Sequence, residues 1–245
     1  MKRIAIFAAL RWECQPPLRP LRGVSKRRVD QFTVWQGRAG DREVWLVKTG
    51  MGVQRTERAA RALVRCSRFD ALVSTGCAGA LAPTLQPGDL VIATTVVDRA
   101  TGRRYDTDAA VRSSWQTVAA RVAVHAVLEP ELCSAEVLTS VADKRAAASA
   151  SGAAAVDMES AAIGACAADA GIGFGLVRAI LDTAKDDVEA SFAFVDAATG
   201  GVKPLALAAH LARHPGALSQ LLTLQRQMSR AQASLSKFFT AWLSA

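Results

Sequence analysis

The sequence contains few of the features that mark several large classes of protein. Only 6% of its 245 residues are aromatic, with a single tyrosine. No basic run is interleaved with aromatic residues, which argues against a surface that stacks nucleic-acid bases. No stretch of about eighteen apolar residues is free of charge, so the sequence predicts no membrane-spanning helix. A globular protein that does not bind nucleic acid is the expectation.

Cysteine and histidine are too scattered to suggest a disulfide framework or a metal centre. The 5 cysteines form no CxxC pair, and their odd number without a leader predicts reduced thiols in a cytoplasm. The start, MKRIAIFAAL, is interrupted by Arg11 and Glu13, and no cleavage site follows, so a buried strand is favoured over a signal peptide. With histidines at positions 125, 210 and 214, no group has metal-ligand spacing. We therefore expect neither a metal nor a cofactor.

The net charge and the apolar content limit the possible partners and the number of domains. The net charge of +8 suits an anionic partner, such as phosphate or a lipid surface, but solubility explains it equally well. Hydrophobic residues make up 51% of the chain and are spread throughout, enough for one sizeable α/β domain or two small ones.

Apolar runs alternate with helical segments along the chain. The pattern predicts strands at 3–9, 41–48, 70–76, 88–98 and 173–181, and helices at 54–68, 152–170 and from Lys203 onward. Glycine-rich or polar stretches predict a turn at 76–81 and loops at 99–115 and 183–203. This alternation predicts one largely parallel, covered α/β sheet, with a core of 1–202 and a helical extension, 203–245.

Four apolar segments end in polar or glycine residues, and three of them carry a carboxylate. The segments are IAIFAALRWE with Glu13, LVSTGCAGAL with Cys77, AAAVDMES with Glu159, and GLVRAILD with Arg178 and Asp182. Because strand ends in an α/β sheet converge, these side chains could share one pocket with shifted pKa values, as acid–base catalysis requires. The alternative is that each is a satisfied strand-end residue or a helix cap.

The same segments resemble the nucleoside phosphorylase/nucleosidase superfamily, and within it the methylthioadenosine/S-adenosylhomocysteine nucleosidases. The matching stretches are LVKTGMGVQRTERAARAL, STGCAGALAPTLQPGDLVIA, VDMES in place of a Glu-Met-Glu motif, and VRAILD in place of an Arg-x-x-x-Asp motif. The tail, GGVKPLALAAHLARHPGALSQLLTLQRQ, resembles instead phosphorylase-like proteins of hopanoid biosynthesis, which are implicated in removing adenine from adenosylhopane. The resemblance implies a single α/β domain with a central mixed, twisted sheet flanked by helices.

The resemblance also implies roles for individual residues. Glu159 would bind the ribose hydroxyls and stabilise the oxocarbenium-like sugar, and Asp182, with a raised pKa, would protonate N7 of the purine. Glu13 would orient or deprotonate the attacking water, and Arg178 would help to place that water or an anion. The expected substrate-binding or supporting residues are Met51, Cys77, Ala78, Gly79, Val141, Asp157 (tied to backbone or to an arginine), Met158 (against the sugar), Phe192 and Phe194.

The nucleophile is less clearly indicated. Phosphorolytic relatives carry an arginine before the Gly-Ser turn, where this chain has Thr75, and this absence together with Glu13 favours water. Cys77 stands where the nucleosidases carry serine, and a thiol is a poor donor to water. The basic residues at 19, 22, 26, 27 and 28 could supply a phosphate site, or form a solvated surface, so phosphate stays a candidate co-substrate.

The predicted activity is cleavage of the N-glycosidic bond of an adenine nucleoside with an apolar 5′ group, best matched by conversion of adenosylhopane to ribosylhopane. A methylthioadenosine/S-adenosylhomocysteine nucleosidase and a purine nucleoside phosphorylase are the alternatives of the same chemistry. A non-catalytic nucleoside-binding protein on this fold, or an unrelated α/β binding module, belongs to another class. The resemblance further implies a homodimer to which residues 99–115 contribute.

The C-terminal segment has its own pattern. From Leu221, apolar residues recur three and four apart and form one stripe of a long helix, flanked by Arg226, Arg230 and Lys237. The stripe could cover the core or a subunit interface. Alternatively, Phe238, Phe239, Trp242 and Leu243 could rest on the inner face of an anionic membrane or shield a lipid tail.

Overall fold

The computed structural model describes residues 2–188 and 217–244. The strands are β1 (Arg3–Ala8), β2 (Arg22–Val29), β3 (Phe32–Ala39), β4 (Arg42–Lys48), β5 (Ala71–Ala80), β6 (Leu90–Asp98), β7 (Arg104–Asp106), β8 (Ala126–Cys133), β9 (Ala155–Asp157) and β10 (Gly173–Asp182). The helices are α1 (Gln15–Leu18), α2 (Val53–Cys66), α3 (Ala109–Arg121), α4 (Val141–Ser151), α5 (Ser160–Ala170) and α8 (Ala217–Leu243).

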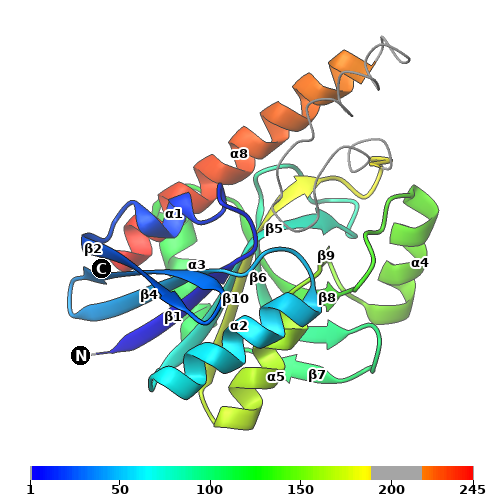
Figure 1. The fold of residues 1–245 in the computed structure, drawn as a ribbon. Helices are drawn as coiled ribbons and strands as arrows, with labels where there is room; N and C mark the ends of the chain where they lie inside the picture. The colour runs from blue at the N-terminus through cyan, green and yellow to red at the C-terminus, as the bar shows by residue number, and fades with distance from the viewer. Residues whose placement is uncertain (1, 189–216, 245) are drawn as a thin grey trace.

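All the described strands belong to one 10-stranded sheet with helices on both faces (Figure 1). Their order is β10-β6-β8-β9-β5-β1-β4-β3-β2, with β7 on β6, and β10 pairs with β5 as well. That extra pairing closes β5, β9, β8, β6 and β10 into a ring, from which β1, β4, β3 and β2 extend as an open sheet. Parallel pairs such as β1–β5 and antiparallel pairs such as β10–β6 occur together. The predicted single α/β domain with a mixed sheet is confirmed.

Strand β1 shows why the sheet is covered on both sides. Ile4, Ile6 and Ala8 contribute to one hydrophobic cluster, which also holds buried side chains of α3 and α8. Ala5 and Phe7 contribute to the opposite cluster, which also holds buried side chains of α2 and α5. Successive side chains of a strand point to opposite faces, so a strand buried on both faces must be apolar throughout.

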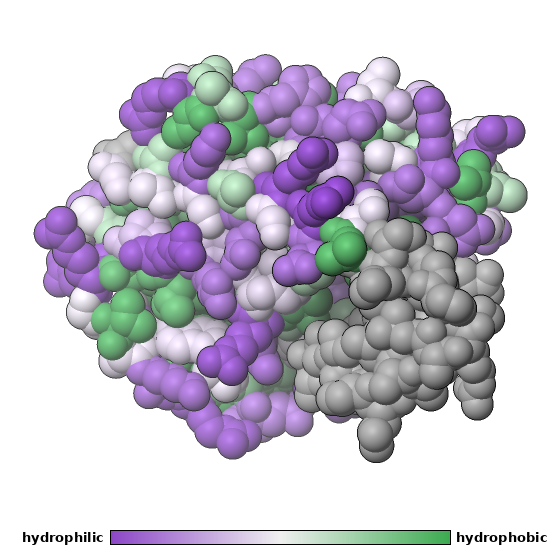
Figure 2. Space-filling view, turned by 90° about the horizontal axis from the view of Figure 1, so that it is seen from above, coloured by the Kyte–Doolittle hydropathy of each residue, from purple (hydrophilic) through white to green (hydrophobic). Residues whose placement is uncertain are grey.

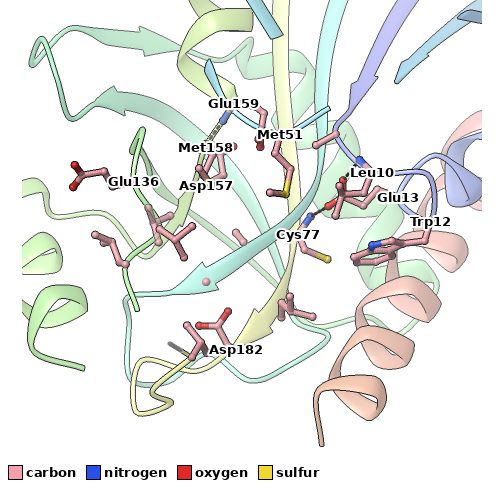
Figure 3. Close-up of a pocket in the computed structure, with 18 residues that line it drawn as sticks. Leu10, Trp12, Glu13, Met51, Cys77, Glu136, Asp157, Met158, Glu159 and Asp182 are labelled. Atoms are coloured by element: carbon pink, nitrogen blue, oxygen red, sulfur yellow. Dashed lines mark hydrogen bonds between the residues drawn. The ribbon is translucent and has the colours of Figure 1, made fainter. Parts of the chain in front are cut away.

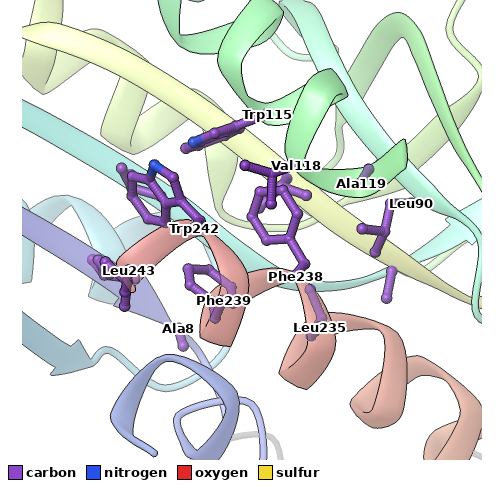
Figure 4. Packing of buried hydrophobic residues seen from close by; sticks show 14 of the residues in the cluster. Ala8, Leu90, Trp115, Val118, Ala119, Leu235, Phe238, Phe239, Trp242 and Leu243 are labelled. Atoms are coloured by element: carbon purple, nitrogen blue, oxygen red, sulfur yellow. The ribbon is translucent and has the colours of Figure 1, made fainter. Parts of the chain in front are cut away.

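Helix α8 packs on the core through the residues in its last three turns (Figure 4). Phe238 and Phe239 are fully buried, and the ring of Trp115 from α3 lies 5.7 Å from Phe238 and 5.1 Å from Trp242, edge to face. Such pairs add stability beyond the area that they bury. The interpretation of these aromatic residues as a membrane-resting end is therefore wrong, and the packing alternative is right.

The coloured part of the face seen in Figure 2 is mostly hydrophilic, and its hydrophobic side chains form separate small groups. The basic run at 22–28 lies on β2, where every one of these residues is exposed. It therefore forms a solvated edge of the sheet, which is the second of the alternatives considered for it. Within the described segments, no helix combines the length and apolarity needed to span a bilayer.

Three local predictions need correction, and some strands were missed. The predicted turn at 76–81 is the second half of β5, because Gly76–Gly79 pair with β10. The predicted loop at 99–115 contains β7 and the start of α3, where the Asp108 carboxylate accepts the N–H groups of Ala110 and Val111. The segment 152–170 is helical only from Ser160, since Val156 and its neighbours pair with β5. Strands β2 and β3 were not predicted.

Candidate active site

One cavity lies at the carboxyl ends of β1, β5 and β10 (Figure 3). It brings together nine of the predicted site residues, which come from five separate segments of the chain. These are Glu13, Met51, Cys77, Ala78, Gly79, Asp157, Met158, Glu159 and Asp182. The prediction that the ends of these strands converge on one pocket is thus confirmed.

Asp157 and Arg178 form the buried base of this site. Arg178 donates through Nε to Asp157 Oδ2 at 2.8 Å and through Nη1 to the Thr75 carbonyl at 2.7 Å, and Nη2 also binds both Asp157 Oδ2 and Ser74 Oγ. Asp157 Oδ1 accepts the N–H groups of Glu159 and Ser160, both at 3.2 Å, and so holds the N-terminus of α5. The expectation that Asp157 is tied to backbone and to an arginine is met.

Arg178 itself does not line the cavity, contrary to its predicted role in placing water or an anion. It is only 1% exposed, and its donors are directed to protein acceptors. Burial alone would lower its pKa, but Asp157, Glu159, Glu131 and Glu13 surround it and raise the pKa instead. The guanidinium is therefore a fixed positive charge beneath the carboxylates of the site.

Glu13 is fixed by backbone donors at both of its oxygens. Oε2 accepts the N–H of Leu10 and Oε1 accepts the N–H of Cys77, each at 2.8 Å. Burial raises the pKa of Glu13, while Arg178 and the backbone N–H groups oppose the rise. Gly76 allows this arrangement, because its φ is +143° and a Cβ there would lie 2.7 Å from Glu13 Oε1 and 2.6 Å from Arg178 Nη1.

Glu159 lies at the start of α5 and faces one backbone N–H donor and one cation. Its Oε1 accepts the N–H of Gly52 at 2.7 Å, in the glycine turn before α2, and Oε2 lies 3.9 Å from Arg178 Nη2. Burial raises the pKa of Glu159 to about 7; Asp157 adds to the rise, and Arg178 opposes it. The carboxyl therefore changes charge near neutral pH.

Asp182 ends β10 on another side of the cavity, next to Gly79. A Cβ on Gly79 would lie 3.2 Å from Asp182 Oδ2, so the glycine leaves room for the carboxyl. Lys144 of α4 donates to Asp182 Oδ2 at 2.5 Å. Burial raises the pKa of Asp182, Lys144 lowers it, and Asp186 raises it again, with a net increase. A carboxyl with a raised pKa can donate a proton.

Cys77 presents its side chain to the cavity, and its backbone N–H is used by Glu13. Burial raises the pKa of the thiol well above the usual value, and the negative charges of Glu13 and Asp182 raise it further. The side chain is therefore a neutral thiol and a weak hydrogen-bond donor rather than a nucleophile.

Three other residues that were expected to bind substrate are not among the described residues that line the cavity. Val141, expected to bind substrate, begins α4 and does not line the cavity, while Phe192 and Phe194 lie outside the described residues. The predictions missed nine lining residues: Ala9, Leu10, Trp12, Glu136, Val137, Leu138, Val156, Leu181 and Val188. Only the first three and Leu181 lie at or beside a predicted strand end, which was their one signal.

Two buried charged residues were also missed. Lys144 occurs in the alanine-rich stretch VADKRAAASAS, which has the composition of a surface helix. Glu131 of β8 is fully buried, and both of its oxygens lack a hydrogen-bond partner among the described residues. Burial and the charge of Asp157 raise the pKa of Glu131 well above its usual value. A carboxylate inside the apolar run ELC was its one signal.

The site thus contains a carboxyl with a raised pKa beside an ammonium group (Asp182), a carboxyl with a pKa of about 7 (Glu159) and a carboxyl held by two N–H groups (Glu13), around a mostly apolar wall. Within the described residues, no group of three or more His, Cys, Asp or Glu side chains could hold a metal ion. The arrangement suits proton transfer and stabilisation of positive charge on an organic substrate.

Comparison with solved structures supports the fold. The S-adenosylhomocysteine nucleosidase from Streptococcus pyogenes, in complex with 5-methylthiotubericidin, has a TM-score of 0.79 at 23% identity over 99% of this chain and 96% of that one. The 5′-methylthioadenosine/S-adenosylhomocysteine nucleosidase from Neisseria meningitidis, with methylthio-immucillin-A, has a TM-score of 0.79 at 18% identity over 100% and 99%. A futalosine hydrolase mutant from Helicobacter pylori strain 26695 has a TM-score of 0.68 at 17% identity over 74% and 89%.

These identities are low, so the solved structures establish a shared fold and no more. The sequence comparison goes further, because a family model described as the phosphorylase superfamily matches residues 3–211. That range includes every strand of the sheet and each of the carboxyl groups around the cavity. The chain belongs to the phosphorylase superfamily.

Proposed function

We propose that this protein is an enzyme that cleaves the N-glycosidic bond of an adenine nucleoside and releases adenine, with water as the nucleophile. The observation that carries the proposal is the set of three carboxyl groups, Glu13, Glu159 and Asp182, held in distinct environments around one cavity. Carboxyl groups with separated pKa values can take separate acid and base roles.

Each carboxyl has a defined part in the reaction. Protonated Asp182 gives its proton to N7 of the purine, and the electron pair of the C1′–N9 bond passes to the departing base. The sugar becomes oxocarbenium-like, and ionised Glu159 stabilises its positive charge while accepting the ribose hydroxyls. A water molecule polarised by Glu13 adds to C1′, and Glu13 takes up the proton that the water loses.

The charge of the cavity wall supports water rather than phosphate. None of the described residues that line the cavity is a lysine or arginine, whereas Glu13, Glu159 and Asp182 are acidic. Arg178 lies beneath Gly76, and Thr75 occupies the place of the arginine of phosphorolytic relatives. A phosphate dianion would meet like charges, and the described lining residues offer no cation to pair with it.

The substituent on C5′ is proposed to be apolar, on the evidence of the wall. Leu10, Trp12, Met51, Leu181 and Val188 contribute large hydrophobic side chains. We favour adenosylhopane as substrate and ribosylhopane as product, because the tail of the chain resembles hopanoid-associated proteins. Methylthioadenosine and S-adenosylhomocysteine, named for the structural relatives, are the alternative substrates.

One assay tests the proposal directly. Purified protein is incubated with adenosylhopane, methylthioadenosine or inosine, with and without phosphate, and the free base is quantified. Adenine release without phosphate is the expected result. Release only with phosphate would make the enzyme a phosphorylase, and no release from any substrate would favour a non-catalytic nucleoside-binding protein on this fold.

We further propose that the enzyme acts in the cytoplasm as a homodimer. The odd number of free cysteines supports the cytoplasm, and the resemblance to dimeric nucleosidases supports the homodimer. Contact with an anionic membrane would use exposed cations, such as Arg226, Arg230 and Lys237 on α8, rather than the buried aromatic end. A monomer in sedimentation at micromolar concentration contradicts the dimer, and flotation with anionic vesicles tests the contact.

A further inference from the structure

Lys144 is a buried cation with no part in the mechanism given above. It is 1% exposed, and with Ala147 it is one of the two buried residues of α4. Burying an ammonium group is unfavourable unless it is paired and hydrogen-bonded. Its position against a reacting carboxyl, rather than elsewhere in the core, therefore calls for an explanation.

All the hydrogen bonds of the ammonium go to the segment that carries Asp182. Nζ donates to Asp182 Oδ2 at 2.5 Å, and to the carbonyl oxygens of Thr183 and Asp186, both at 2.9 Å. An ammonium group has three donors, so these contacts account for every one of them. The lysine consequently fixes both the carboxyl and the turn that follows β10.

The contact also decides which carboxyl oxygen faces the substrate. Oδ2 is occupied by Lys144, so Oδ1 is the oxygen available to carry a proton toward the base. Once that proton has passed to N7, Asp182 is negatively charged, and the adjacent ammonium balances the charge. We propose that Lys144 is a positioning residue that orients Asp182 and stabilises the carboxylate left after proton transfer to the purine.

This inference rests on the proposed function and predicts a property that a purely structural lysine would not have. The other groups that act on Asp182 are Asp186 in the following turn and Cys77 on β5, while Gln227 of α8 binds Asp186 at 3.3 Å. Lys144 is the one cation in direct contact with Asp182 among the described residues. Its removal should therefore raise the pKa of Asp182.

The direction of the change in the pH profile follows from the two groups involved. Activity requires protonated Asp182 and ionised Glu13 and Glu159, so the optimum lies midway between the pKa of Asp182 and the higher of the other two pKa values. An adjacent opposite charge shifts a carboxyl pKa by about 1–3 units, so its loss should move the optimum upward by about 0.5–1.5 pH units.

The experiment compares the pH dependence of kcat in Lys144→Gln, Lys144→Met and Lys144→Arg with wild type. Gln keeps N–H donors for the two carbonyl groups but has no charge, which makes it the fallback if Met prevents folding. Arg keeps the charge and should retain the wild-type optimum. Arg145→Met, at the exposed next position of α4, is the matched control and should change nothing.

An upward shift of the optimum in the neutral variants alone supports the inference. An unchanged optimum, with loss only of thermal stability or of substrate affinity, overturns the inference. Lys144 would then only stabilise the turn after β10 through its hydrogen bonds to the Thr183 and Asp186 carbonyls. The proposed function is judged separately: wild type that releases no adenine, or Asp182→Asn that keeps full turnover, refutes the mechanism itself rather than the role of Lys144.

Discussion

Replacement of Gly76 by alanine should damage both the stability and the activity of the protein. Gly76 has a φ of +143°, a region that residues with a side chain rarely enter, and its Cβ would lie 2.6 Å from Arg178 Nη1. Strained backbone of this kind costs about 1–3 kcal/mol. Displacing the guanidinium from Asp157 would add up to the cost of breaking a buried ion pair, about 3–5 kcal/mol. We expect a total loss of about 4 kcal/mol or more.

Gly152 provides the matched control for this substitution. It ends α4 with a φ of +67°, and nothing lies within 4 Å of a Cβ built on it. Gly152→Ala therefore carries the backbone penalty without a collision, and should cost about 1 kcal/mol. The difference between the two variants isolates the close approach of Glu13 and Arg178 across Gly76.

Urea unfolding followed by far-UV circular dichroism gives the two losses of stability, and adenine release gives kcat. In folded Gly76→Ala, displacement of Glu13 by about 1 Å should reduce kcat about a hundredfold. The reasoning is refuted if Gly76→Ala is no less stable than Gly152→Ala and its kcat stays within threefold of wild type.

Asp182→Asn should reduce kcat about a hundredfold or more without unfolding the protein, because an amide cannot protonate N7; near-normal turnover would move the acid elsewhere. Since the pKa of Glu159 is raised to about 7, kcat should rise with pH through that value, and Glu159→Gln should lose this rise as well as affinity for the ribose. Glu13→Gln should slow the chemical step and leave KM nearly unchanged, and a large change in KM alone would contradict its role toward water. Phe238→Ala should lower the free energy of unfolding by about 3–5 kcal/mol, because the ring is fully buried; a loss below about 1 kcal/mol in urea unfolding would contradict the packing of α8 on the core.

The pattern of the sequence predicts the long, continuously apolar strands well, but it misses β2, β3 and β8, in which exposed or half-buried residues interrupt the apolar run, and it assigns the short strand β9 to a helix. Strands β1 and β10 are buried on both faces, so each is a continuous apolar run that can be recognised without a structure. Strand β2 has seven exposed residues in a row, many of them basic, and therefore lacks the alternation that identifies a half-buried strand. The hairpin of β2 and β3 was missed because β2 lies at the edge of the sheet, where its side chains are exposed.

The same reasoning separates the predicted from the missed site residues. Glu13, Glu159 and Asp182 each follow an apolar strand, so their meeting at one end of the sheet could be foreseen from the order of the segments. Lys144 reaches the site from a helix whose neighbouring side chains are short and mostly exposed, and nothing in that stretch marks one lysine as buried. Contacts between a helix and a distant strand end are set by the fold rather than by local sequence.

The packing of α8 has a consequence for the order in which the protein assembles during synthesis. Gln232 donates to Gln15 Oε1 at 2.9 Å, across 217 residues of chain, and also reaches the Trp12 carbonyl beside Glu13. At roughly 5–20 residues per second, about 10–40 s separate the translation of these two positions. The turn with Glu13 emerges from the ribosome early and can meet Cys77 soon afterwards, but it gains its contacts with α8 only when that helix follows. The nascent chain should therefore be inactive, and exposed to proteases near residue 13, until one of its last segments has been made.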